Sequence, residues 1–227
     1  MPENQAHGKI WEKDIAINVY KVTEEEFNSF SHGACIDVPR EFNHLDGTDL
    51  SIKCSCGNSI DMADIGRIFK KFNSGEKIHL VLIRCVQINP TTKKVKDIIE
   101  VDLTNSGELL FGTVTQSEID EFVEYIKAIP HYGRTAEHQK TYKQMASVLN
   151  KKSGWISYSP KVDSEKQRRV QGHFKNFSKF VKENPERVIA QSQTGDFRGG
   201  KIAEEIVSTP RLRKKKEPAP APDSAPR

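Results

Sequence analysis

Two short segments of the sequence carry acidic and basic side chains that could share one face of a β-sheet. The first contains Asp37, and the second reads Asp-Leu-Ser-Ile-Lys at residues 49–53. Because side chains alternate across a strand, Asp49, Ser51 and Lys53 share one face of the second segment. Carboxylates suit Mg²⁺, and a neighbouring ammonium can orient a water and stabilise negative charge. These residue types therefore suit a hydrolytic metal site.

A hairpin or short meander must bring these residues together. Two alternating segments flank a loop that holds Asn43 and the turn-forming pair Asp46-Gly47. Strand pairing centred near His44 would place Asp37 opposite Ser51. A helix predicted over residues 61–73, capped by Asn58 or Ser59, follows at once and carries further carboxylates. Of these, Asp64 is the better placed to reach the same spot, and Asp61 is the alternative.

This arrangement resembles the PD-(D/E)XK nuclease family, in which an acid on one strand precedes an acid-x-Lys tripeptide on the next and then a helix. The tripeptide here is Ser51-Ile52-Lys53, so the usual acid is missing. Some restriction endonucleases of this family carry Ser-x-Lys and supply the carboxylate from the following helix, where Asp64 stands. The resemblance covers the order of elements over residues 8–103.

The resemblance implies a Mg²⁺-dependent endonuclease that cleaves double-stranded DNA. Asp37 and Asp64, with Asp49 or Glu12, would hold the metal, and Lys53 would orient or activate the attacking water. Ser51 could touch the metal only through a water. A homodimer is expected from the family and from the symmetry of palindromic DNA sites.

The segment before this hairpin is predicted to be an amphipathic helix over residues 8–22. Its apolar stripe contains Trp11, Ile15 and Val19, and Glu12 borders the stripe. In the family that this chain resembles, a first-helix glutamate often reaches the metal, so Glu12 is either a site residue or an ordinary solvated glutamate. Thr23-Glu-Glu-Glu then forms a capping box that opens a short helix.

The rest of the chain predicts an α/β fold with a mixed central β-sheet flanked by helices, like that of a restriction endonuclease. A largely apolar run over residues 77–87 predicts a central strand, and residues 94–103 a partner strand. Residues 107–114 could add a short strand, and helices follow over 117–129, 135–150 and 176–183. We assign residues 1–207 to a single domain, with 33–103 as its catalytic sheet core.

A basic segment over residues 151–190 is the candidate DNA-recognition part. Residues 1–150 hold 17 Lys and Arg against 22 Asp and Glu, whereas residues 151–216 hold 17 against 7. This contrast suits an acidic metal site beside a polyanion-binding surface. Residues 163–171 also resemble an Asp-Ser-x-x-Gln-Arg-Arg-Val-Gln segment of some restriction-like endonucleases. The candidate DNA contacts are Lys161, Lys166, Gln167, Arg168, Arg169 and Gln171.

The four cysteines, Cys35, Cys54, Cys56 and Cys85, are expected to be reduced and near the core. A zinc-bound structural adaptor is a weaker alternative, because no His-x(3–5)-His accompanies Cys54-x-Cys56. A DNA-binding protein without catalysis is the main rival to the nuclease.

The composition leads us to expect a soluble intracellular protein that does not enter membranes. Order is expected to fade after the helix over residues 176–183. Residues 208–227, a basic cluster followed by a Pro-Ala tail, are expected to be disordered, with nuclear targeting as one possible role.

Overall fold

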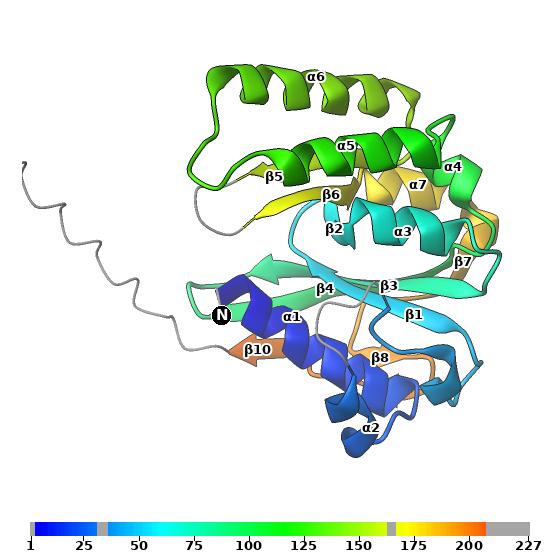
Figure 1. The fold of residues 1–227 in the computed structure, drawn as a ribbon. Coiled ribbons are helices and arrows are strands. Elements are labelled where there is room, and N and C mark those ends of the chain that lie inside the picture. The colour runs from blue at the N-terminus through cyan, green and yellow to red at the C-terminus, as the bar shows by residue number, and fades with distance from the viewer. Residues whose placement is uncertain (1–2, 31–35, 163–166, 208–227) are drawn as a thin grey trace, which may run out of the picture.

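The protein has an α/β fold built on a mixed central sheet (Figure 1). The computed structural model describes residues 3–30, 36–162 and 167–207. The long strand β3 (Ile78–Gln87) lies between β1 (Asp49–Ser55), to which it runs parallel, and β4 (Thr92–Asp102), to which it runs antiparallel. The other edge of β4 pairs with two C-terminal strands, β7 (Val188–Ser192) and β10 (Glu205–Val207). The sequence thus correctly predicted an α/β fold with a mixed central sheet, and it correctly predicted the central strand.

A second, antiparallel sheet is formed by β2 (Ile60–Asp64), β6 (Arg168–Phe174) and β5 (Ile156–Val162), in that order. A tight hairpin of β8 (Asp196–Phe197) and β9 (Gly200–Lys201) forms the third. Its turn places Arg198 at φ 47° and Gly199 at φ 79°, a left-handed conformation that glycine adopts without strain and arginine rarely adopts.

Helices cover both faces of the central sheet. On one face lie α1 (Glu3–Asp14), its continuation as a π-helix (Ile15–Val19) and α2 (Glu24–Ser29). The opposite side carries the second sheet and the remaining α-helices, namely α3 (Ile65–Phe72), α4 (Gly107–Phe111), α5 (Gln116–Ala128), α6 (Ala136–Lys152) and α7 (Phe177–Glu183). Short 3-10 turns occur at Arg40–Phe42 and Pro185–Arg187.

The central sheet separates two hydrophobic cores because alternate residues of β3 point to opposite faces. Val81 and Ile83 pack with Trp11 of α1, whereas Leu80 and Leu82 belong to the larger core with the second sheet and α3 to α7. This double burial explains why β3 reads as a continuous apolar run.

Several predicted elements are confirmed. Trp11, Ile15 and Val19 are buried on one side of the N-terminal helix. The capping box at Thr23 is present, with Glu26 as its partner. Helices α5, α6 and α7 lie within a few residues of the predicted ranges.

Three local predictions are wrong. Residues 60–64 form a strand, and Asp64 rather than Asn58 or Ser59 caps the following helix. Residues 107–111 are helical instead of extended. Residues 188–207 remain ordered, because their strands complete the edge of β4 and bury Phe197 and Ile206. In each case tertiary contacts override the local pattern.

Cysteine pairing also differs from expectation. Cys56 and Cys85 form a disulfide, and Cys54 is a free thiol. Cys35 lies outside the described residues, as do Lys166 and the 208–227 tail. The expectation of reduced cysteines therefore fails for one pair.

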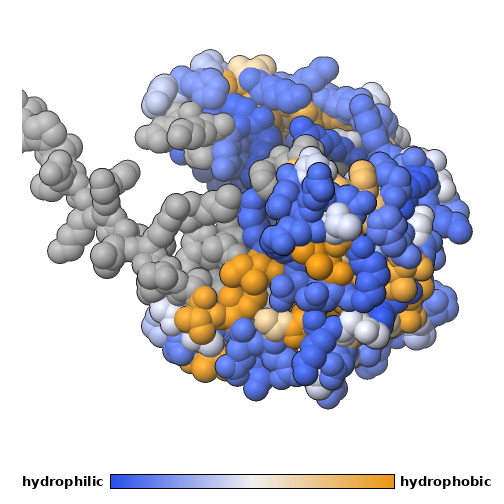
Figure 2. Space-filling view, turned by 90° about the horizontal axis from the view of Figure 1, so that it is seen from below, coloured by the Kyte–Doolittle hydropathy of each residue, from blue (hydrophilic) through white to orange (hydrophobic). Residues whose placement is uncertain are grey.

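The surface is mostly hydrophilic on the face seen in Figure 2, with hydrophobic residues in smaller patches. Every helix within the described ranges is too short or too polar to span a bilayer.

Candidate active site

Asp37 reaches the central sheet through a single antiparallel bridge. Val38 pairs with Leu50, and the two residues exchange backbone hydrogen bonds of 2.9 and 3.1 Å. The pairing is therefore centred on His44, as the sequence predicts. Among the described residues next to Asp37, only this bridge forms, so residues 36–39 make no full strand.

The carboxylate of Asp37 lies over β1. Its Oδ2 accepts a hydrogen bond of 2.7 Å from the backbone N–H of Ile52 and another of 2.5 Å from Nζ of Lys53. Ser51 Oγ donates to the same oxygen at 3.4 Å. The side chains of Lys53 and Asp37 are only 19% and 14% exposed, so this ion pair is shielded from solvent more than a surface pair would be.

Glu12 of α1 completes the group. Burial, followed by the charge of Asp37 and a hydrogen bond with Asp37, raises the pKa of its carboxyl to about 7, while the charge of Lys53 opposes the rise. The structure thus brings together Glu12, Asp37, Ser51 and Lys53, four of the residues selected from the sequence. We call these four residues the Lys53 cluster.

Asp49 lies on the predicted face of β1 but belongs to a different group. Its Oδ1 accepts from the backbone N–H of Arg40 at 2.8 Å, and its Oδ2 accepts from Arg40 Nη2 at 2.7 Å and Lys71 Nζ at 2.5 Å. Burial favours a higher pKa for Asp49, but the hydrogen bonds from Arg40 and Lys71 lower it. Two cations therefore already compensate this carboxylate.

Asp64 and Asp61 lie on β2 of the second sheet. Asp64 Oδ1 accepts from the backbone N–H groups of Gly66 and Arg67, which is an N-cap for α3. Asp61 pairs with Nδ1 of His173 on β6 at 2.5 Å. Among the described residues, hydrogen bonds join Asp64 to its own helix rather than to the Lys53 cluster.

The residues of the candidate DNA-recognition segment differ in exposure, because residues 168–174 form the strand β6. Arg169 is exposed and pairs across the ladder with Lys161 of β5. Gln171 is only 8% exposed and faces Asp64 in the ladder with β2. Gln167 precedes the strand and is half-buried.

Arg168 has a role that the sequence did not reveal. Its guanidinium donates to the carbonyl oxygens of Ile129 and Pro130, both at 2.8 Å, at the end of α5. This side chain thereby ties β6 to the loop between α5 and α6.

A second acidic group lies on the opposite face of the central sheet and was also missed. Asp46, His79 and Glu100 each offer a ligand atom within 4.8 Å of the others. Nη1 of Arg198 donates to Asp46 at 2.7 Å and to both oxygens of Glu100 at 2.9 Å, and His79 Nδ1 lies 2.7 Å from Glu100. We call this the Arg198 cluster. The sequence contained one sign of this cluster: an ionisable residue, His79 or Glu100, lies within each of two apolar strands, β3 and β4.

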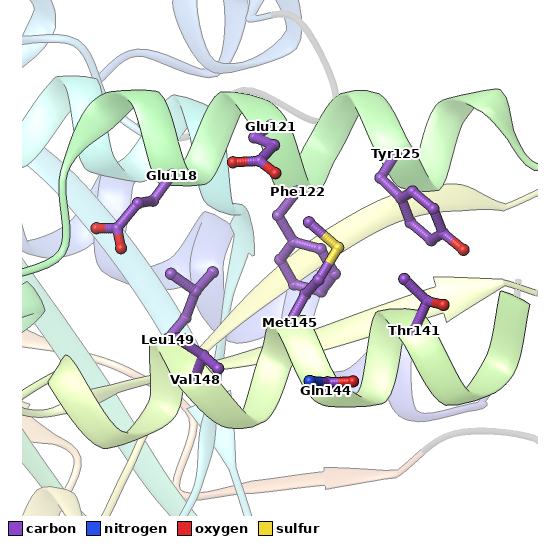
Figure 3. A pocket seen from close by; sticks show the side chains of 9 residues that line it. All are labelled: Glu118, Glu121, Phe122, Tyr125, Thr141, Gln144, Met145, Val148 and Leu149. Carbon is purple, nitrogen blue, oxygen red and sulfur yellow. The ribbon is translucent and has the colours of Figure 1, made fainter.

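A cavity of about 470 Å³ lies between α5 and α6, away from both clusters (Figure 3). Figure 3 shows side chains from both helices facing this space, including Phe122 and Met145, with Glu118 and Glu121 at its margin.

Comparison with known proteins adds no family to this description. No protein-family model matches the chain, and neither a curated protein nor a solved structure matches it significantly.

Proposed function

We propose that this protein is a Mg²⁺-dependent endodeoxyribonuclease of the PD-(D/E)XK type, acting on double-stranded DNA like a sequence-specific restriction endonuclease. The observation that supports the proposal most is the convergence of Glu12, Asp37 and Lys53, which come from a helix, a loop and a strand. The Ser51-Ile52-Lys53 tripeptide lies beside Asp37, as the resemblance requires of the Ser-x-Lys variant.

The donor set of the Lys53 cluster fits a hard divalent cation. Two carboxyl groups, Glu12 and Asp37, face each other, and the charges of Lys53 and Lys9 do not offset burial and the charge of Asp37, so Glu12 tends to keep its proton. Replacing that proton by Mg²⁺ would leave Glu12 ionised and supply positive charge between the two carboxylates. Asp49 and Asp64 are less suited as ligands, since Arg40 and Lys71 neutralise the first and the second caps α3.

Each residue of the Lys53 cluster would have its own role in hydrolysis. Bound Mg²⁺ would polarise the scissile phosphate and acidify a bound water. Asp37 holds the ammonium of Lys53 in place at 2.5 Å, so Lys53 can position the water and stabilise charge on the phosphorane. Ser51 supports Asp37 with its hydroxyl instead of contributing a carboxylate.

The test is cleavage of supercoiled plasmid with Mg²⁺, with and without EDTA, by the native protein and two variants. Lys53→Met removes the ammonium and should lower the rate at least about 100-fold. Lys96→Met is the matched control, because Lys96 is an exposed lysine on β4 outside the cluster. Cleavage that resists EDTA, or full activity of Lys53→Met, would overturn the assignment.

A DNA-binding protein without catalysis is the second candidate, favoured by the exposed Arg169 beside Lys161. Specific binding of duplex DNA without any Mg²⁺-dependent cleavage would select it. For the nuclease we also propose a homodimer, since a palindromic site presents two equivalent strands. Sedimentation of the protein with and without duplex DNA tests this state.

A further inference from the structure

Three of the four cysteines gather at one end of the β1–β3 pair. The parallel register aligns Cys54 with Ile83 and Ser55 with Arg84, so the next step brings Cys56 beside Cys85. These two residues form the disulfide, with their Cα atoms 4.6 Å apart. Sγ of the free thiol Cys54 lies 3.7 Å from Sγ of Cys85. Cys85 therefore has a sulfur neighbour on each side.

The spacing of Cys54 and Cys85 matches that of two thiolates on one metal ion. A Zn–S bond is about 2.3 Å long, which places sulfur atoms about 3.8 Å apart at the corners of a tetrahedron. The observed 3.7 Å meets this requirement without any backbone movement. Cys56 would need only to separate from Cys85 to reach a third corner, and it precedes an exposed turn, residues 57–59.

The three cysteines differ in their exposure to solvent. Cys56 is exposed, Cys54 is half-buried and Cys85 is 3% exposed. A reductant can therefore reach the disulfide at Cys56, while Cys85 stays fixed within the sheet. Burial raises the pKa of the Cys54 thiol to about 11, which keeps it protonated and inert until a metal displaces the proton.

We propose that Cys54, Cys56 and Cys85 form a three-thiolate site for a soft metal ion such as Zn²⁺, and that the disulfide is the oxidised, metal-free form of this site. A dithiol reductant would give two electrons and two protons to the disulfide, becoming a disulfide itself and leaving Cys56 and Cys85 as thiols. Binding of Zn²⁺ would then release the thiol protons to solvent, and a water would fill the fourth position.

This site is independent of the proposed nuclease activity, although Cys54 directly follows Lys53 in β1. The two sites differ in chemistry. Thiolates select soft ions, whereas the carboxylates of Glu12 and Asp37 suit Mg²⁺. A metal that binds one site should therefore leave the other available.

The experiment uses the full-length chain with Cys35→Ser, which removes the remaining cysteine from the measurement. After reduction with a phosphine, the protein is titrated with Cd²⁺ while the sulfur-to-metal charge-transfer absorption is recorded. We expect one Cd²⁺ per chain, retained Cd²⁺ binding in the presence of excess Mg²⁺, and competition by Zn²⁺. The unreduced protein should show no such absorption.

Variants locate the site. Cys56→Ser, at an exposed position, should weaken Cd²⁺ binding at least tenfold, and Cys54→Ser should do the same. Ser59→Ala, in the adjacent turn, is the matched control and should bind like the parent. Cd²⁺ binding without the absorption would assign the ion to carboxylates such as those of the Arg198 cluster and overturn the proposal. Unchanged binding by Cys56→Ser would overturn it as well.

Discussion

The Lys53 cluster and the Arg198 cluster place carboxyl groups on the same central sheet, yet their charges are balanced differently. In the first, Lys53 pairs with Asp37, and the pKa of Glu12 rises to about 7 despite the charges of Lys53 and Lys9. In the second, the guanidinium of Arg198 bonds to both Asp46 and Glu100. The comparison teaches that a carboxylate pair marks a cation site only where the chain itself supplies too little positive charge.

The two clusters also differ in how they join the chain. The Lys53 cluster takes all its members from residues 12–53. The Arg198 cluster instead joins Asp46 to a residue 152 positions later. It holds the β8–β9 hairpin against the sheet, with Arg198 also 5.7 Å from the centre of the Tyr20 ring. This difference supports a structural role for the Arg198 cluster and is consistent with the catalytic role proposed for the Lys53 cluster.

The largest effect on stability is expected from Arg198→Met. Glu100 is fully buried, and loss of its guanidinium partner would leave a buried carboxylate beside Asp46 with His79, 2.7 Å away, as its neighbour. Breaking a buried ion pair on one side typically costs about 3–5 kcal/mol, to be measured by urea unfolding. Lys201→Met, in the same hairpin but exposed, should change the free energy of unfolding by less than about 0.5 kcal/mol. Equal losses of stability in the two variants would show that the Arg198 cluster has no special role in stability.

The next largest effect is expected on activity, from Asp37→Asn. This variant removes a proposed metal ligand and the anion that holds Lys53, so the Mg²⁺-dependent rate should fall at least about 100-fold, about 2.7 kcal/mol in the barrier. Asp49→Asn should lower the rate far less, because Asp49 bonds to Arg40 and Lys71 instead. The opposite ranking would move the metal site towards Asp49.

Glu12→Gln should make the metal-free protein more stable. The pKa of Glu12 is about 7 in the folded state and near 4.5 when unfolded, so the folded state binds more protons between these values and loses stability as pH rises through them. The variant lacks this loss. Its gain should be near zero at pH 4 and reach at most about 3 kcal/mol above pH 7. Unfolding of both proteins in the presence of EDTA at several pH values measures this gain in stability. A gain that does not change with pH would show that ionisation of Glu12 is not its cause.

The smallest effect is expected from Arg169→Ala on DNA binding. Arg169 is exposed and can therefore reach DNA. If it contacts a base edge, its loss should cost about 1–3 kcal/mol of discrimination between sequences. If it contacts a phosphate, its loss should instead lower the salt dependence of binding by about one phosphate contact. Arg168→Ala should act on stability rather than on binding, since its side chain bonds to Ile129 and Pro130. Competition binding at two salt concentrations, with unfolding curves, separates the two arginines.

Local pattern was sufficient to predict much of the Lys53 cluster. Alternation places Ser51 and Lys53 on one face, the loop composition sets a pairing centred on His44, and the helix stripe sets the side of Glu12. All three signals act over a few residues.

Other parts depend on partners that lie far away in the sequence. Ile60–Asp64 is a strand because β6, more than 100 residues later, pairs with it. Asp49 leaves the predicted site because Lys71 reaches it from α3. Cys56 meets Cys85 because β1 and β3 are parallel neighbours. Such pairings follow from topology, which a single sequence pattern does not encode.

The pairing of β4 with the last described strands has a consequence during synthesis. One edge of β4 stays open until β7 and β10 have left the ribosome, and Glu100 has no guanidinium partner until Arg198 has emerged. At about 5–20 residues per second, the ribosome needs roughly 5–20 s to cover that interval. We expect the nascent chain to remain incompletely folded over this time, and the finished sheet to form only after β10 has left the ribosome.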